Sequence, residues 1–477
     1  MMSGPNGAKP RSLWRAHRQA LLAAGAMIAL GSAPALAQLD TGTGLVASKK
    51  VSGRSSAEYG MAPIPASAES LFPQVNAYLN QYGTAVILDN VDEFLGVVSG
   101  PRKGSTNAGQ YGLEWDQDWN VLAGIPGLET HAIAVGRYGS LAGGIIGDNG
   151  LNQSQEIYGA GGNVAIHLVF FYAEETLLHG GLDIAAGRMP MENDFDSNPL
   201  NCNFMQNSLC GNAKGITDNS ANVSYPDAQW AIRPRIRPIP QVYLQFGLYF
   251  TENNTYQANN GYRSGFHLDG SHIDGEAFPI ELGYEPKIGP DQMPGHYKIG
   301  AMYENTNHNS WELPTVPTET RKGGTQAWFQ FDQMLVRNGP GATDGVIVIG
   351  NYNHNDERYA ERGNQYVIAA IDRDFWHARP FDTIGVLFAY QQISNRLTKL
   401  QGLEQELGLP LSGNFQTSFP GSVGPQSHAI NIELNYQIHV YRGVTFAPDF
   451  QYFIRPNAER GLPDAAMVGF KSHITLF

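Results

Sequence analysis

Apolar and polar residues alternate along most of this chain. In residues 431–439, Ile432, Leu434, Tyr436 and Ile438 occupy every second position, with polar residues between them. Successive side chains of a β-strand point to opposite faces, so this segment predicts a strand with one apolar and one polar side. Repetition of that pattern along a whole chain is typical of a transmembrane β-barrel, whose outer face meets lipid and whose inner face meets water.

From Thr84 onward the alternation predicts about sixteen strands, an even number that suits a bacterial outer-membrane barrel. Short Gly- or Pro-containing connections alternate with long ones, as expected when one rim has turns and the other has loops. The predicted strands are residues 84–98, 110–122, 128–138, 163–174, 181–190, 227–236, 241–252, 277–286, 295–306, 325–336, 344–354, 365–374, 381–392, 427–438, 443–455 and 465–477. We therefore expect an all-β fold, an antiparallel barrel with both chain ends at the short-turn rim.

Two of these strands carry charged residues on the face opposite their apolar residues. In the strand at 227–236, the arginines alternate with Ile232 and Ile236. A Lys or Arg on the lipid face at mid-membrane costs roughly 2–4 kcal/mol, so the charged face should line a water-filled lumen. The inward charged residues predicted from the two strands are Arg233, Arg235, Glu114, Asp116 and Asp118.

One tryptophan stands on a polar face. Trp328 lies between Gln326 and Gln330 in the strand at 325–336, where membrane anchoring does not call for an aromatic ring. Sugars present C–H groups on their faces and hydroxyls at their edges, so an aromatic face beside amides and arginines suits a sugar contact. Two simpler interpretations stay open: Trp328 fills a gap in the wall, and the arginines balance the acidic strand.

The first part of the chain has the pattern of an export signal. Residues 1–37 combine a basic start, an apolar run at 20–30 and the small-x-small triplet at 35–37, which predicts a signal peptide cut before Gln38. The apolar run is too short to span a membrane. Residues 38–82 predict a flexible leader and then a helix over 69–82 that ends at Gly83, with the barrel occupying 83–477.

Composition narrows the function classes. The 477-residue chain has a formal net charge of -13 and no basic cluster, which argues against nucleic acid as a partner. The two cysteines, Cys202 and Cys210, are close in sequence, and an exported chain meets an oxidising compartment. A disulfide that closes a small loop is therefore the natural interpretation, with two free thiols as the alternative.

Enzyme motifs are absent from the sequence: there is no G-x-S-x-G, no H-E-x-x-H and no P-loop. We therefore expect neither an enzyme nor a cofactor. One acidic and histidine-rich stretch within 253–276 could bind a divalent ion, although a solvated loop is the simpler interpretation. Its residues are His267, Asp269, His272, Asp274 and Glu276. An outer-membrane enzyme, a plugged structural barrel and a secreted β-sandwich lectin remain as alternatives to a channel.

Three segments resemble a known family: GLDIAAGRMP at 181–190, LQFGLY at 244–249 and APDFQYFIRP at 447–456. With the paired cysteines, the chain resembles the carbohydrate-selective porins, OprB type, of Gram-negative outer membranes. The resemblance implies a sixteen-stranded barrel that admits monosaccharides and related polyols by diffusion. Porins of this size commonly fold their third loop inward to narrow the pore, and here that loop, 191–226, carries both cysteines. Association into homo-oligomers stays open.

Overall fold

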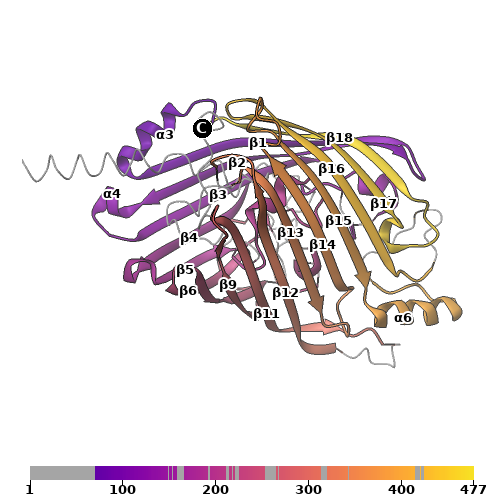
Figure 1. Cartoon of the computed structure of the whole chain (residues 1–477). Helices are drawn as coiled ribbons and strands as arrows, with labels where there is room; N and C mark the ends of the chain where they lie inside the picture. The colour runs from indigo at the N-terminus through magenta and orange to yellow at the C-terminus, as the bar shows by residue number, and fades with distance from the viewer. Residues whose placement is uncertain are drawn as a thin grey trace, which may run out of the picture.

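A computed structural model describes residues 70–477, except 149, 153, 158–165, 192–193, 211–213, 218, 221–224, 253–264, 267, 313–319, 342, 414–418 and 420–423. The predicted signal peptide and almost all of the predicted leader therefore lie outside the described residues. Consecutive strands pair antiparallel, and the first pairs with the last, so the sheet closes on itself (Figure 1). The result is a closed barrel of sixteen antiparallel strands, as predicted.

The strand bounds follow the predicted ranges closely. β7 and β8 are two parts of one barrel strand, and β10 is a short extension beside β11. The strands are β1 (Thr84–Ser99), β2 (Gly104–Asp118), β3 (Leu128–Gly139), β4 (His167–Leu177), β5 (Leu182–Met189), β6 (Gln229–Ile239), β7 (Val242–Phe246), β8 (Leu248–Glu252), β9 (Ile273–Tyr284), β10 (Lys287–Ile288), β11 (Met293–Asn309), β12 (Thr320–Arg337), β13 (Gly345–Asn355), β14 (Arg362–Arg373), β15 (Thr383–Ile393), β16 (His428–Tyr441), β17 (Val444–Ile454) and β18 (Ala465–Thr475).

The predicted facing of the residues on β6 is confirmed. On β6, Ile232 and Ile236 are exposed on the outside, while Arg233 and Arg235 between them are buried inside. The same alternation continues in β9, where exposed Ile280 and other apolar residues stand between buried inward ones. The barrel therefore has an apolar outer surface and a polar interior, as a membrane-spanning barrel requires.

Polar pairs also join the two ends of the sheet. β1 and β18 pair antiparallel with Glu93 opposite Lys471. Nearby, His473 Nε2 lies 3.0 Å from Asp89 Oδ2 in the barrel interior. The side chains of the last strand therefore alternate like the others, with Phe470 on the outside against the Phe94 ring.

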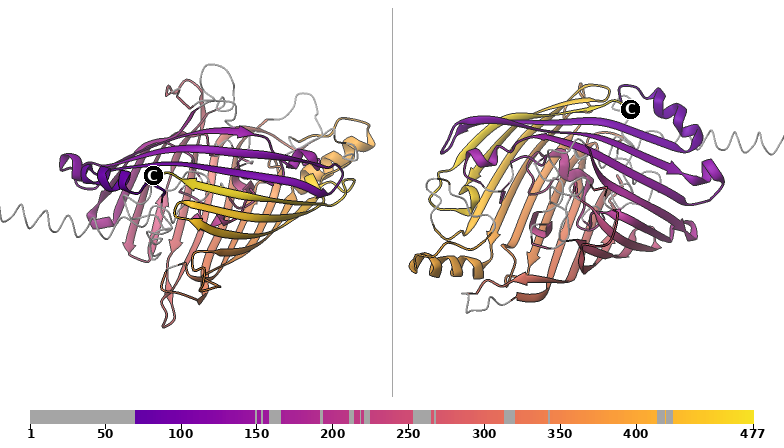
Figure 2. Two further views of the ribbon diagram at one scale, coloured as in Figure 1. Left: turned by 90° about the horizontal axis from the view of Figure 1, so that it is seen from above. Right: turned by 180° about the vertical axis from the view of Figure 1, so that it is seen from behind.

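Short helices occupy the rims. α3 (Gln74–Leu79) and a 3₁₀ turn end at Gly83, whose φ of 71° is left-handed, so the predicted helix and its end are confirmed. Asn76 ties α3 to β1 by bonding both backbone groups of Val86 at 2.7 and 2.8 Å. α4 (Trp119–Ala123) lies at the same rim as α3, and α6 (Asn395–Glu406) lies at the opposite one (Figures 1 and 2).

Two of these helices differ from the prediction. β2 ends at Asp118, so Trp119 starts α4 and is not an outward strand residue as expected. The long connection after β15 contains α6, which Ser394 caps and whose Leu397 and Leu400 are buried; it had been expected as a loop. No helix in the described part of the chain is long and apolar enough to cross a membrane.

Candidate functional site

The connection between β5 and β6, residues 190–228, is the third one at its rim and is called the third loop here. It folds into the barrel and bonds to the inner wall on several strands. The Asp196 carboxylate accepts hydrogen bonds from Asn351 and Asn353 on β13, both at 2.7 Å. Farther along, the backbone N–H groups of Met205 and Gln206 donate to the Glu433 carboxylate on β16 at 2.7 and 2.8 Å. The loop is therefore fixed to the wall at separate points along its length.

The disulfide in this loop is present as predicted. Cys202 and Cys210 are bonded, and both are buried. Between and beside them, Phe204 and Leu209 pack with Ile349 of β13 and other wall residues. The cross-link therefore holds a compact, apolar part of the loop against the inner wall of β12–β15.

The connection between β3 and β4, called the second loop here, also reaches the inner wall. Gln155 donates to the backbone oxygen of Glu93 on β1 at 2.7 Å, and Gln451 on β17 donates to that of Ser154 at 2.8 Å. Ile146 of the second loop and Met205 of the third loop belong to one apolar cluster. The two loops thus share the barrel interior, and their meeting narrows it.

Carboxylates tie the second loop to the connection between β17 and β18. Asp148 accepts backbone hydrogen bonds from Asn152 and from Asn457, both at 3.0 Å. Burial raises the pKa of Asp148, although these N–H groups act in the opposite direction. Burial also raises the pKa of Glu459, which accepts from Asn457 Nδ2 at 3.2 Å, to about 7. Glu459 is therefore the carboxylate of this connection that we expect to change its protonation state near neutral pH.

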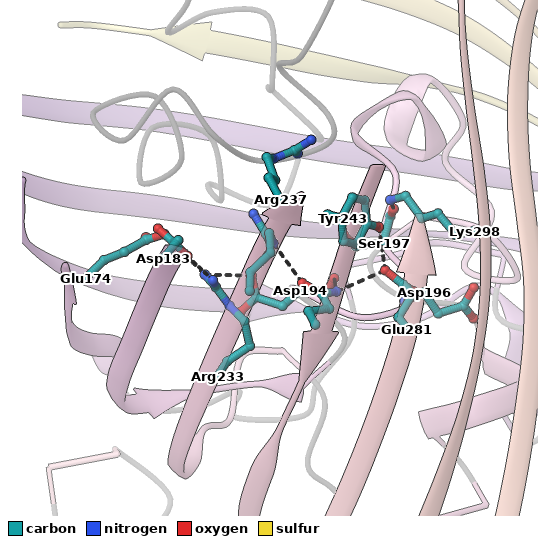
Figure 3. A network of polar contacts seen from close by, with 12 residues as sticks. Glu174, Asp183, Asp194, Asp196, Ser197, Arg233, Arg237, Tyr243, Glu281 and Lys298 are labelled. Atoms are coloured by element: carbon teal, nitrogen blue, oxygen red, sulfur yellow. Dashed lines mark hydrogen bonds and ion pairs between the residues drawn. The ribbon is translucent and has the colours of Figure 1, made fainter. Parts of the chain in front are cut away.

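The predicted arginines lie in a charged network on the wall beside the third loop (Figure 3). The Arg233 guanidinium pairs with Asp183 on β5, with Glu174 on β4 at 3.2 Å and with Asp194 of the third loop at 3.4 Å. Arg235 lies 3.3 Å from the same Asp194 carboxylate. The arginines face inward as predicted, but they are buried rather than open to lumen water because carboxylates and the loop cover them.

The predicted acidic strand is separate from the arginines. β3, β4 and β5 lie between β2 and β6 in the sheet. Glu114 and Asp116 are buried on the inner face, and Asp116 lies 2.6 Å from His131 Nδ1. Asp118 has a different role from the predicted one, since its side chain accepts from Asn120 N and caps α4 at the rim. The strand ends there, so the alternation no longer sets its direction.

Trp328 faces inward as expected, but its ring is covered. The side chain is 2% exposed, and the indole N–H donates to Glu281 on β9 at 2.7 Å. The Phe195 ring of the third loop packs edge-on against it, with centroids 6.4 Å apart. On β11 the ring fills the space above Gly300, where a Cβ would lie 2.2 Å from the indole. The predicted sugar-stacking face is thus occupied by protein in this structure.

Sequence reasoning missed the residues that anchor the third loop: Glu281, Glu433, Asn351, Asn353 and the loop residue Asp196. One signal was present. Glu281 is a carboxylate at inward parity between the outward residues Ile280 and Leu282. A charged side chain on the inner face of a barrel strand needs an ion-pair or hydrogen-bond partner when it is buried. The partners of Glu281 come from segments that are distant in sequence.

The acidic stretch at 253–276 does not form a metal site in the described residues. Among them, no group of three or more His, Cys, Asp or Glu side chains could hold an ion. Thr251 donates to Asp274 at 3.2 Å, and Glu276 bonds with Asn305. His267 lies outside the described residues.

Comparisons with known proteins agree with this architecture. Residues 102–476 match the family model described as the carbohydrate-selective porin, OprB family. Porin B of Pseudomonas aeruginosa is 25% identical over 375 residues, which cover 76% of this chain and 80% of that protein. The putative porin QuiX of Acinetobacter baylyi is 26% identical over 328 residues, covering 68% of this chain and 72% of that protein.

A solved structure shares the fold. The high-pH structure of Pseudomonas putida OprB superposes with a TM-score of 0.77 at 22% identity, covering 86% of this chain and all (100%) of that one. The barrel and the family match place the protein in the outer membrane of a Gram-negative bacterium. The match over most of its length shows that the chain belongs to the OprB family of carbohydrate-selective porins.

Proposed function

We propose that this porin passes neutral monosaccharides and related polyols by diffusion, along a path beside the third loop. The observation that carries the proposal is the third loop itself, which crosses the lumen. Its Asp196 is fixed to Asn351 and Asn353 on β13, and its backbone at residues 205–206 is fixed to Glu433 on β16. A fixed constriction lined by polar groups selects solutes by size and by hydrogen bonding without trapping them.

The charged wall suits neutral solutes. Arg233 and Arg235 stand beside Asp183, Glu174 and Asp194, so positive and negative groups are closely matched. Because these buried groups largely neutralise one another within the wall, they leave no strong net field in the lumen to favour ions. The apolar outer face of the barrel would contact membrane lipid. No catalytic step is part of this proposal.

A plugged barrel is the second candidate, because one observation favours it. Inward side chains such as Arg233 and Trp328 are almost fully covered by the third loop and the neighbouring wall. A plugged barrel needs the loops to close the lumen, whereas a porin needs a water-filled path beside them.

Current across a planar lipid bilayer distinguishes the two candidates. The purified protein should produce stepwise, ohmic conductance increments in potassium chloride, and added glucose should reduce the current through open channels. A correctly folded barrel that inserts and gives no conductance would support the plugged barrel instead.

A further inference from the structure

Glu281 on β9 is a carboxylate with four donors. Its Oε1 accepts from the Tyr243 hydroxyl at 2.6 Å and from Gln245 Nε2 at 2.9 Å. Its Oε2 accepts from Trp328 Nε1 at 2.7 Å and from the backbone N–H of Asp196 at 2.9 Å. An ionised carboxylate has about four acceptor sites, so all the acceptor sites of Glu281 are occupied. Glu281 is itself wholly buried, so it has no contact with lumen water.

One of the four donors belongs to the third loop and the other three to the wall. Tyr243 and Gln245 are on β7, and Trp328 is on β12. Asp196 comes from the loop, and Figure 3 shows it beside Glu281 and Tyr243. The carboxylate therefore acts as a bridge between the rigid wall and the start of the constriction.

The loop is held tightly at this point. Asp196 has a left-handed φ of 52°, which is uncommon for a residue other than glycine. Its backbone N–H bonds to Glu281, and its side chain bonds to Asn351 and Asn353 on β13. Lys298 on β11 also donates to the backbone oxygen of Ser197. Contacts from three strands thus maintain a backbone conformation that the loop would otherwise leave.

Trp328 transmits the same restraint to the preceding loop residue, Phe195. Its ring lies between Gly300 of the wall and Phe195 of the loop. The hydrogen bond to Glu281 fixes the plane of the indole, and that plane fixes the position of the Phe195 ring. The carboxylate therefore sets the position of residues 195 and 196 together.

We propose that Glu281 is a positioning residue that holds the third loop against the barrel wall, and so sets the gap between loop and wall and the largest sugar that passes. This inference rests on the proposed sugar-conducting function. Glu281 does not touch the solute. It acts through Asp196 and through the Trp328–Phe195 contact, because its Oε2 accepts both the Asp196 backbone N–H and the indole N–H.

Glu281→Gln is the sharpest test of the charge and acceptor pattern. The amide keeps the size of the side chain but replaces one oxygen by an NH₂ donor. With its NH₂ in the place of Oε2, the amide faces two donors, Trp328 Nε1 and Asp196 N. With its NH₂ in the place of Oε1, it faces the donor Gln245 Nε2, which also holds the backbone oxygen of Asp194 in the loop, while the Tyr243 hydroxyl can turn to accept. The loop should then move away from the wall more often and open the gap.

Glu285→Gln is the matched control. Glu285 follows β9, is buried, and pairs with Arg237 at 2.9 Å, with no bond to the third loop among the described contacts. Both variants remove one negative charge from the same side of the barrel. A change caused by charge alone would therefore appear in both, whereas a change in loop position would appear only in Glu281→Gln.

The measurement is a ratio of two liposome swelling rates, the rate with a disaccharide divided by the rate with a monosaccharide. Each protein is first shown to be folded by its heat-modifiable mobility in gel electrophoresis. Passage through a narrow pore depends steeply on solute size, so we expect the ratio to rise at least about twofold in Glu281→Gln and to stay at the wild-type value in Glu285→Gln. A folded Glu281→Gln barrel with the wild-type ratio, or an equal rise in both variants, would overturn the positioning role.

Glu281→Asp covers the case in which the glutamine variant does not fold. It keeps the charge and withdraws the carboxylate by one methylene, so a smaller rise in the ratio is expected, and a wild-type ratio would overturn the proposal. Wild-type protein that passes no sugar would overturn both this inference and the proposed function. Normal sugar passage with an unchanged ratio would overturn this inference alone.

Discussion

Removal of the Arg233 guanidinium is the strongest single perturbation of the charged wall. In wild type this group contacts three carboxylates, those of Asp183, Glu174 and Asp194, and it is buried. Arg233→Gln leaves these carboxylates with one cation nearby, Arg235, which lies 3.3 Å from Asp194. The wall then carries one more net negative charge than before.

Breaking a buried ion pair by removing one partner costs about 3–5 kcal/mol because the remaining charge stays buried without compensation. Arg235 still serves Asp194, so we expect a loss of about 3 kcal/mol in the free energy of unfolding, at the lower end of that range. Screening acts over a Debye length of about 10 Å at 0.1 M salt, so ions that pass within that distance of the added negative charge should feel it.

The assay is the reversal potential across a planar bilayer under a potassium chloride gradient. Arg233→Gln should shift it toward cation selectivity, and Arg233→Gln combined with Arg235→Gln should shift it further. Arg396→Gln is the control, because Arg396 on α6 is half exposed and lies 3.7 Å from Glu312 at the rim. Exposed pairs of this kind are worth about 0–1 kcal/mol. An unchanged reversal potential in folded Arg233→Gln, or the same shift in the control, would refute the reasoning.

Three further predictions concern the loops and the rim. Cys202→Ala removes the disulfide to Cys210, so we expect a looser third loop and an altered single-channel conductance. The gel mobility of the variant should still be that of an intact barrel. Unchanged conductance would count against a constriction role for this part of the loop. Glu433→Gln weakens the acceptor for the backbone N–H groups of Met205 and Gln206, so open-channel current noise should increase, and equally quiet channels would show that this anchor is dispensable. The pKa of Glu459 is raised from 4.5 to about 7 in the folded state. Between these pH values the folded state binds more protons than the unfolded state, so the stability that the protonated form contributes is lost as the pH rises through 7. Hydrogen exchange in the β17–β18 connection should therefore be faster at pH 8 than at pH 5.5 after correction for intrinsic rates, and Glu459→Gln should abolish the difference; a difference that persists in the variant would assign it to another group.

Much of the barrel was predictable because a period of two sets the face of every strand residue. Arg233 and Arg235 were assigned inward, and Ile232 and Ile236 outward, from alternation alone. The end of the first helix at Gly83 was also predictable, since a left-handed φ favours glycine there. These features depend on neighbouring residues, which the sequence presents directly.

Features that depend on distant contacts were not predictable in this way. Alternation continues past Asp118, yet the chain turns into α4 there, so Asp118 caps a helix and does not line the lumen. Trp328 has the parity of a lumen residue, but Phe195, far away in sequence, covers its ring. No local sequence pattern predicts which wall strands a loop of this length will contact. The anchors at Glu281 and Glu433 depend on the course of the third loop across the inner wall, so they could not be predicted.

Liposome swelling with a panel of neutral solutes tests the central claim most directly. The account predicts that proteoliposomes of the wild-type protein swell in isotonic glucose and in a polyol of similar size, and that the rate falls steeply for disaccharides and larger sugars. Rates that fall no faster than free diffusion would contradict a constriction by the third loop. Absence of swelling with every solute, from protein that is folded and inserted, would contradict the claim that this barrel conducts sugars.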